Sequence, residues 1–183
     1  MNKPLAFKQL LLAASFVMLP LAQAATLAKA DYAAEKTRIG AAYKTDKAAC
    51  ASFTANAKDI CVEQAQAKEK VARAEVEYAY TGKVKDQNNV LVTKAKADYA
   101  VAKEKCDDMK GNDKDVCVKE AKAIEVKALA DAKMGKQISA AQTDAAADKR
   151  NADYKVAVEK CDAMTGDAKA GCITAAKTQF GKS

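Results

Sequence analysis

The sequence predicts an all-α protein made of three tandem, disulfide-linked antiparallel helical hairpins, with an elongated or coiled-coil-like shape. Alanine and lysine, which are strong helix formers, dominate the chain after residue 24, and both prolines lie before that residue. Six cysteines form three pairs, and the members of each pair are eleven positions apart. Similar residues surround every pair with a period of 56 and then 55 residues, which indicates internal duplication.

Residues 1–24 have the pattern of a secretory signal peptide. Lys3 and Lys8 precede an apolar run at 10–21, and residues 22–24 provide a cleavage site of small side chains. The run is too short for a membrane anchor, and no second long apolar stretch follows it. We therefore expect an exported protein with no transmembrane segment in the mature chain, in the periplasm or outside the cell. Disulfides are stable in such oxidising compartments.

Each cysteine pair brackets a signal that ends one helix and begins another. In the middle unit, Gly111 is expected to close a helix in the left-handed conformation, and Asn112 to cap the next helix through its side-chain oxygen. The first unit has Ala55 where the other units have glycine, so its turn is the least well specified. The corresponding turn residues are Ala55 and Asn56 in the first unit and Gly166 and Asp167 in the third.

The turn decides how the cysteines pair. In one unbroken helix, Cys106 and Cys117 would lie roughly 16 Å apart, which is too far for a disulfide. If the chain folds back at Gly111, they lie at one level on antiparallel arms. We therefore expect disulfides within hairpins: Cys50 with Cys61, Cys106 with Cys117 and Cys161 with Cys172.

Six helices follow from these signals. Gly82, Gly135 and Gly181 each precede a lysine and are expected to end the second arm of a unit, with polar connectors at 86–89 and 137–139. The expected domains are a signal peptide at 1–24 and hairpin repeats at 25–83, 84–136 and 137–183. The expected helices are 27–54, 57–81, 88–110, 113–134, 139–165 and 168–180.

A narrow apolar seam precedes the first cysteine of each unit, because apolar residues recur at three- and four-residue steps. This pattern is typical of antiparallel coiled-coil packing. Tyr43, Tyr99 and Tyr154 share the seam face with the cysteine seven positions later, so we expect them to pack beside the disulfide and not to bind a ligand. In the middle unit the seam consists of Val92, Ala95, Tyr99, Ala102, Cys106 and Met109, and Met164 ends the seam of the third unit.

The residues that enzymes most often use are missing or badly placed. Histidine is absent, which removes the commonest general base, the partner of Ser–His and Cys–His nucleophiles, and the commonest metal ligand. Neighbouring acids such as Asp107 and Asp108 point in different directions on a helix. The thiols lack the four-residue spacing that favours soft copper ions. We therefore expect no enzyme, no catalytic residue, no cofactor and no metal.

The charge pattern indicates solvated helix faces. Removing Lys3 and Lys8 with the signal peptide lowers the formal charge from +7 to +5, and the lysines alternate with acids along the chain. Arginines occur only at positions 38, 73 and 150, which, with the interspersed acids and the export signal, argues against nucleic acid as a partner.

The segment 97–122, with Lys105-Cys106-Asp107, Gly111-Asn112 and Cys117-Val118, resembles a largely uncharacterised family of exported, Ala/Lys-rich disulfide-hairpin repeat proteins of Gram-negative bacteria. Some members are labelled TolA-like or cell envelope biogenesis protein. The resemblance covers the chain after residue 24, most clearly at 90–125 and 150–180. It implies an exported helical protein and supplies no activity.

The expected function is therefore that of a non-catalytic periplasmic protein, a structural spacer or an adaptor with a protein partner in the cell envelope. A peripheral binder of anionic envelope surfaces is the alternative, because the mature chain is positively charged. Thiol-redox or soft-metal handling is a third and weaker hypothesis that rests on the cysteines alone.

Overall fold

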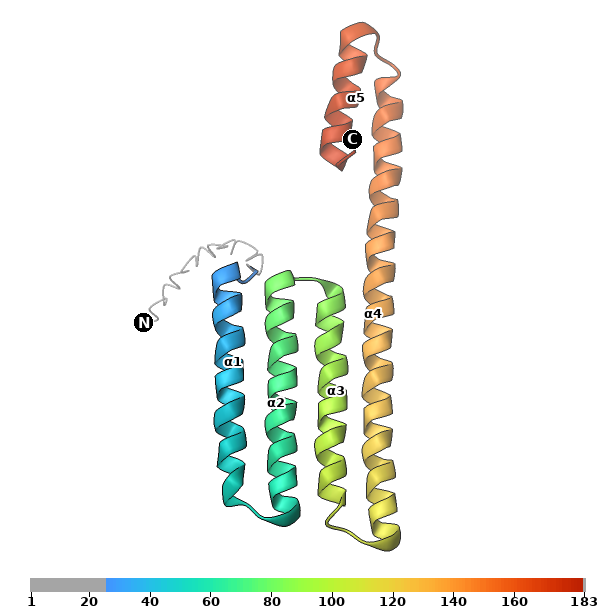
Figure 1. The fold of residues 1–183 in the computed structure, drawn as a ribbon. Helices are drawn as coiled ribbons and strands as arrows, with labels where there is room; N and C mark the ends of the chain where they lie inside the picture. Colours follow the sequence, from blue (N-terminus) through green and yellow to red (C-terminus); the bar gives the residue numbers. More distant parts are fainter. Residues whose placement is uncertain (1–25, 183) are drawn as a thin grey trace, which may run out of the picture.

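The computed structural model describes residues 26–182, which are almost entirely helical (Figure 1). The predicted signal peptide lies outside these residues. Within them no strand occurs, and no helix is both long and apolar enough to cross a membrane. Five α-helices follow one another, and a single 3-10 turn at Cys50–Ser52 ends the first: α1 (Lys29–Ala49), α2 (Ala55–Thr81), α3 (Val84–Cys106), α4 (Gly111–Cys161) and α5 (Gly166–Phe180).

The three disulfide-linked antiparallel hairpins are confirmed. Hairpin 1 consists of α1 and α2, hairpin 2 of α3 and the first half of α4, and hairpin 3 of the end of α4 and α5. The Cα atoms of the bonded cysteines are 5.5, 5.7 and 5.7 Å apart in hairpins 1, 2 and 3, within the usual range for a disulfide. All six cysteines are bonded as the spacing predicted.

The predicted break between the fourth and fifth helices is wrong. The expected helices at 113–134 and 139–165 are one continuous helix, α4, of 51 residues, and the expected domain boundary after residue 136 lies inside it. Gly135 does not end a helix, because one glycine in a helix interior costs only about 1 kcal/mol relative to alanine. The expected connector at 137–139 contains no residue that breaks a helix, and alanine and lysine flank it.

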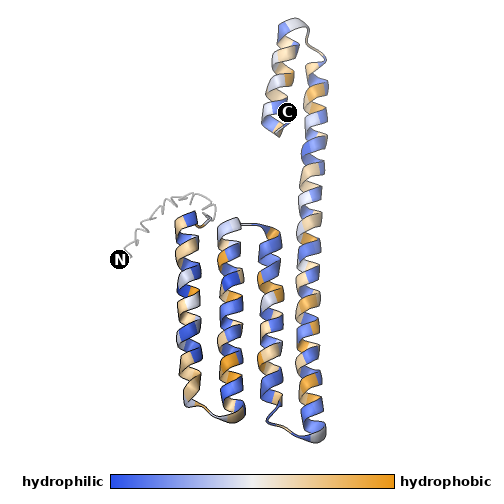
Figure 2. Ribbon diagram, viewed as in Figure 1, coloured by the Kyte–Doolittle hydropathy of each residue, from blue (hydrophilic) through white to orange (hydrophobic). Residues whose placement is uncertain are grey.

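The helices form a single layer in which each helix packs only against its neighbours in the sequence. α1 to α4 lie side by side in chain order, and α2 packs on α3 to join hairpins 1 and 2 (Figure 1). α4 continues past this layer and carries α5 beyond it, on the same side of α4 as α3. Hydrophilic and hydrophobic residues alternate along every helix, as expected for a layer that is solvated on both faces (Figure 2).

The buried core is a narrow strip of alanine and cystine, as the seam pattern predicted. The first cysteine of each pair is fully buried. Met109 and Met164 are exceptions to the prediction, because they are about half exposed. α3 and α4 end at Cys106 and Cys161, so residues three positions later no longer follow the seam. The other buried apolar residues are Ile39, Ala65, Ala74, Val76, Ala95, Ala97, Ala121, Ala132 and Ala176.

The turns confirm the left-handed conformation but not the predicted caps. Gly111 and Gly166 have φ of +57° and +59° and stand at the first positions of α4 and α5, and Ala55 adopts the same conformation at φ +49°. No side chain caps the start of α2, α4 or α5. Instead of capping α2, Asn56 donates from Nδ2 to the backbone carbonyl of Glu104 at 3.0 Å. This hydrogen bond fastens hairpin 1 to the end of α3.

Candidate functional site

The strongest candidate for a functional surface is the set of three hairpin tips. We define tip 1 as residues 50–61, tip 2 as residues 106–117 and tip 3 as residues 161–172. Each tip begins at a fully buried cysteine and ends at its disulfide partner. Tips 1 and 2 lie together at one end of the layer, and tip 3 lies at the far end of α4 (Figure 1).

Every tip presents an apolar side chain to solvent three residues after its first cysteine. Phe53, Met109 and Met164 are 49%, 46% and 45% exposed. Their backbone N–H groups donate to the carbonyls of Cys50, Cys106 and Cys161 at 3.0 to 3.1 Å. This hydrogen bond closes a tight turn three residues after the cysteine, so the disulfide and the turn together fix where the apolar side chain stands.

An ion pair crosses tips 2 and 3 but not tip 1. Lys114 contacts Asp107 at 2.9 Å, and Lys169 contacts Asp162 at 3.0 Å. The hydrogen bond to Asp107, together with the negative charge of that carboxylate, raises the pKa of Lys114 above its ordinary value. In tip 1 the position of the acid is occupied by Ala51. Tip 1 therefore has the largest exposed apolar side chain of the three tips and lacks the ion pair that crosses the other two.

The seam tyrosines support the arms behind the tips. The Lys122 ammonium group lies 4.9 Å from the ring centre of Tyr99 and contacts the buried carboxylate of Glu125 at 2.6 Å. The hydrogen bond to Glu125 raises the pKa of Lys122, so the ammonium stays charged beside the ring. Tyr154 meets Phe180 edge-on, with ring centres 6.2 Å apart. Tyr99 and Tyr154 therefore take part in the packing of the arms.

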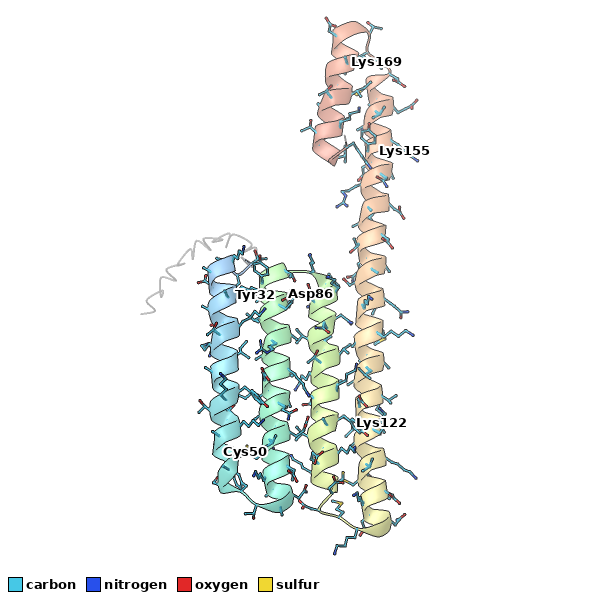
Figure 3. The ribbon with its side chains drawn as sticks, in the orientation of Figure 1. Tyr32, Cys50, Asp86, Lys122, Lys155 and Lys169 are labelled. Atoms are coloured by element: carbon cyan, nitrogen blue, oxygen red, sulfur yellow. A yellow bond between two sulfur atoms is a disulfide. The ribbon has the colours of Figure 1, made fainter. Side chains whose placement is uncertain are left out.

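A second aromatic cluster closes the open end of hairpin 1. Tyr32 stacks on Tyr80 with ring centres 4.4 Å apart, and its hydroxyl group donates to Glu77. That hydrogen bond raises the pKa of Tyr32. Figure 3 shows Tyr32 and Asp86 at this end of the layer and Cys50 at the other. Sequence reasoning missed this cluster, because its members come from the far ends of two helices that pair only in the folded hairpin.

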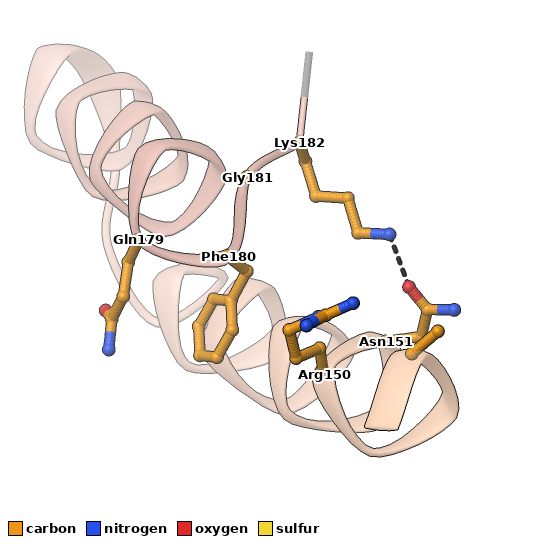
Figure 4. A pocket seen from close by; sticks show the side chains of 7 residues that line it. Arg150, Asn151, Gln179, Phe180, Gly181 and Lys182 are labelled. Atoms are coloured by element: carbon orange, nitrogen blue, oxygen red, sulfur yellow. Dashed lines mark hydrogen bonds between the residues drawn. The ribbon is translucent and has the colours of Figure 1, made fainter. Parts of the chain in front are cut away.

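The described residues contain no metal-binding cluster. No group of three or more Cys, Asp or Glu side chains in this part of the chain is placed to hold a metal ion. The hollow at the end of α5 is open and cationic, and is lined by Arg150, Asn151, Phe180 and Lys182 (Figure 4). Lys182 donates to the side-chain oxygen of Asn151, as drawn there. The described residues that line this hollow include no Asp or Glu.

The sequence located the disulfides of the tips but not their exposed apolar residues. Phe53 and Met109 lie at equivalent positions, and their recurrence three residues after a cysteine was the available signal. The seam interpretation assigned that signal to the core. Comparisons with protein-family models, with curated proteins and with solved structures found no match to this chain.

Proposed function

We propose that this protein is a non-catalytic spacer or adaptor of the bacterial cell envelope, which holds two protein-binding ends a fixed distance apart. The observation that carries the proposal is the continuity of α4. Its 51 residues span about 75 Å at the helical rise, with tip 2 at its first turn and tip 3 at its last. Tip 1 stands beside tip 2, so the two ends differ in size and composition.

The tips suit protein contact because they are ordered before any partner binds. A disulfide closes each loop of about a dozen residues, and a backbone hydrogen bond fixes the exposed Phe53, Met109 or Met164. Binding through such preorganised side chains avoids most of the entropy lost when a flexible loop is ordered. Aromatic and methionine side chains are also enriched in protein interfaces.

The charges favour this proposal over binding to an anionic surface. Lys114 and Lys169 at tips 2 and 3 are already paired with acids of their own tips. Along the helices, Lys68 and Lys94 likewise contact Asp46 and Asp98. A flat anionic surface would have to compete with these local partners, and attraction to a net charge of a few units is weak at physiological salt.

The proposal is tested by photo-crosslinking in cells that produce the full chain. A photoreactive amino acid replaces Phe53 at one end or Met164 at the other, and Ile124, an exposed residue on a broad face of the layer, serves as the matched control. We expect discrete protein adducts from Phe53 and from Met164, in the periplasmic fraction, and none from Ile124. Equal labelling at all three positions, or none at either tip, would remove the basis for an adaptor.

A further inference from the structure

One edge of α4 carries exposed apolar side chains along its whole length, interrupted by the exposed Glu120, Lys127 and Asp148. We define the outer edge of α4 by seven residues whose directions fall within a sector of about 80° on the helix. The buried Ala121 and Ala132, and Cys161, through which α4 is bonded to α5, lie on the other side of the helix. The outer edge consists of Val116, Ala123, Ala130 and Met134 in the first half of α4, and Ala145, Ala152 and Val156 in the second.

The first half of this edge repeats the face with which α2 packs on α3. When Cys61 is aligned with Cys117, four residues of α2 correspond to the first four of the outer edge. Those α2 residues are covered: Ala74 is only 6% exposed, and the other three are half-buried, whereas all four counterparts on α4 are exposed. The corresponding α2 residues are Ile60, Ala67, Ala74 and Tyr78.

The second half repeats the complementary face of α3. When Cys106 is aligned with Cys161, Val90, Ala97 and Val101 correspond to the last three residues of the outer edge. Ala97 is buried and Val101 is half-buried, and Val101 lies with Ala67 at the junction of α2 and α3. The counterpart of Val101, Val156, is 55% exposed. α4 therefore carries both sides of the α2–α3 contact, except that Lys127 and Asp148 replace Val71 of α2 and Thr93 of α3. No helix among the described residues packs on either side.

These two faces cannot meet within one chain while α4 is straight. If a second α4 lies antiparallel to the first, the α2-like half of each helix packs on the α3-like half of the other. The two resulting contacts are related by one two-fold axis. We propose that two copies of this chain form a dimer through the outer edges of α4. Each half of the outer edge is then covered by the partner chain, in the way that α2 and α3 cover each other in the monomer. The contact is self-complementary, as two-fold interfaces must be. This proposal stands independently of the spacer or adaptor function.

The repeat also gives the register of the dimer. In the monomer, Asn56 is bonded to the carbonyl of Glu104. The equivalent positions on α4 are Asn112 and Glu159, so Asn112 of one chain is placed opposite Glu159 of the other. The axis then passes close to residue 136, which is the midpoint of Gly111–Cys161. The two α4 helices overlap over their full length, and the exposed Met134 and Ile138 flank the axis.

Mass measurement on the purified mature protein tests the dimer. Light scattering after size-exclusion chromatography is expected to give twice the chain mass. Ala130→Glu combined with Ala152→Glu places a carboxylate on both halves of the edge and is expected to give the monomer mass. Ile124→Lys is the matched control, because its counterpart on α2 is Lys68, a solvated residue, and it is expected to remain dimeric. A wild-type monomer, or an unaffected double variant, would overturn the proposal.

Lysine cross-linking of a mixture of isotopically heavy and light protein identifies the arrangement. Lys119 and Lys155 are about 54 Å apart along one straight α4, which is beyond the reach of a short cross-linking reagent. In the proposed register, Lys119 of one chain faces Lys155 of the other. We expect a Lys119–Lys155 cross-link in mixed heavy–light pairs. The same cross-link confined to unmixed pairs would show that α4 bends near Gly135 and that hairpin 3 covers the edge within its own chain, which contradicts the dimer.

Discussion

Removing the disulfide of hairpin 3 is expected to unfold α5 while the four-helix layer stays intact. α5 has 15 residues, packs only against α4, and buries a single residue, Ala176. A disulfide that closes a loop of about a dozen residues contributes on the order of 3 kcal/mol in the chain-entropy model. The edge contact of Phe180 with Tyr154 contributes roughly 1 kcal/mol, and an isolated helix of this length is marginal in water.

The perturbation is the double variant Cys161→Ala, Cys172→Ala, and the assay is amide hydrogen exchange followed by mass spectrometry. Loss of about 3 kcal/mol lowers the protection of the α5 amides on the order of 100-fold. The matched control is Cys106→Ala, Cys117→Ala. α3 keeps its packing on α2 as well as on α4, so its amides are expected to remain protected.

Slow exchange across α5 in the first variant would refute this reasoning. It would mean that the helix contacts of hairpin 3 suffice without the covalent bond, and that the small alanine core contributes more than its buried residues indicate. Equal loss of protection in α3 of the control would show that packing on α2 and α4 does not keep α3 folded without its disulfide.

Three further predictions concern the turns and the charges. Ala55→Gly is expected to stabilise the protein by up to about 1 kcal/mol, because φ is +49° there, and Gly111→Ala to destabilise it by about 1 kcal/mol, as thermal unfolding would show. The raised pKa of Lys114 means that its pair with Asp107 stabilises the fold below the unfolded pKa, near 10.5, and that this stability is lost as pH rises through the folded pKa. Asp107→Ala should therefore lower the melting temperature at neutral pH but not at strongly alkaline pH. We also expect negligible co-sedimentation with anionic liposomes at physiological salt, and firm, salt-sensitive binding would restore the anionic-surface hypothesis.

The hairpins and their disulfides were predictable because their determinants are local. The separation of Cys106 and Cys117 and the turn at Gly111 lie within a few residues of each other, and only a reversal of the chain between them permits the bond. The Asn112 cap was not confirmed, although the left-handed turn beside it was. Capping competes with other hydrogen bonds, and in hairpin 1 a distant carbonyl takes the side chain of Asn56.

The continuity of α4 was not predictable from the same signals. Gly82 and Gly135 have similar sequence surroundings, yet Gly82 ends α2 at φ +61° and Gly135 lies within α4. The cost of glycine in a helix is small enough for packing to decide between these outcomes. At Gly82 the chain turns because α3 then covers α2, and this contact, which joins residues far apart in the sequence, has no local signature.

The disulfides connect each cysteine to the next cysteine along the chain. Six cysteines allow on the order of 15 complete pairings, most of which require isomerisation if they form first. A chain that enters an oxidising compartment from its N-terminus presents Cys50 and Cys61 before any competing thiol arrives. If this chain is exported in that way, the order of emergence selects the native bonds, and each hairpin is covalently closed while the next is still being delivered. An oxidase that joins thiols as they appear is sufficient to complete this fold.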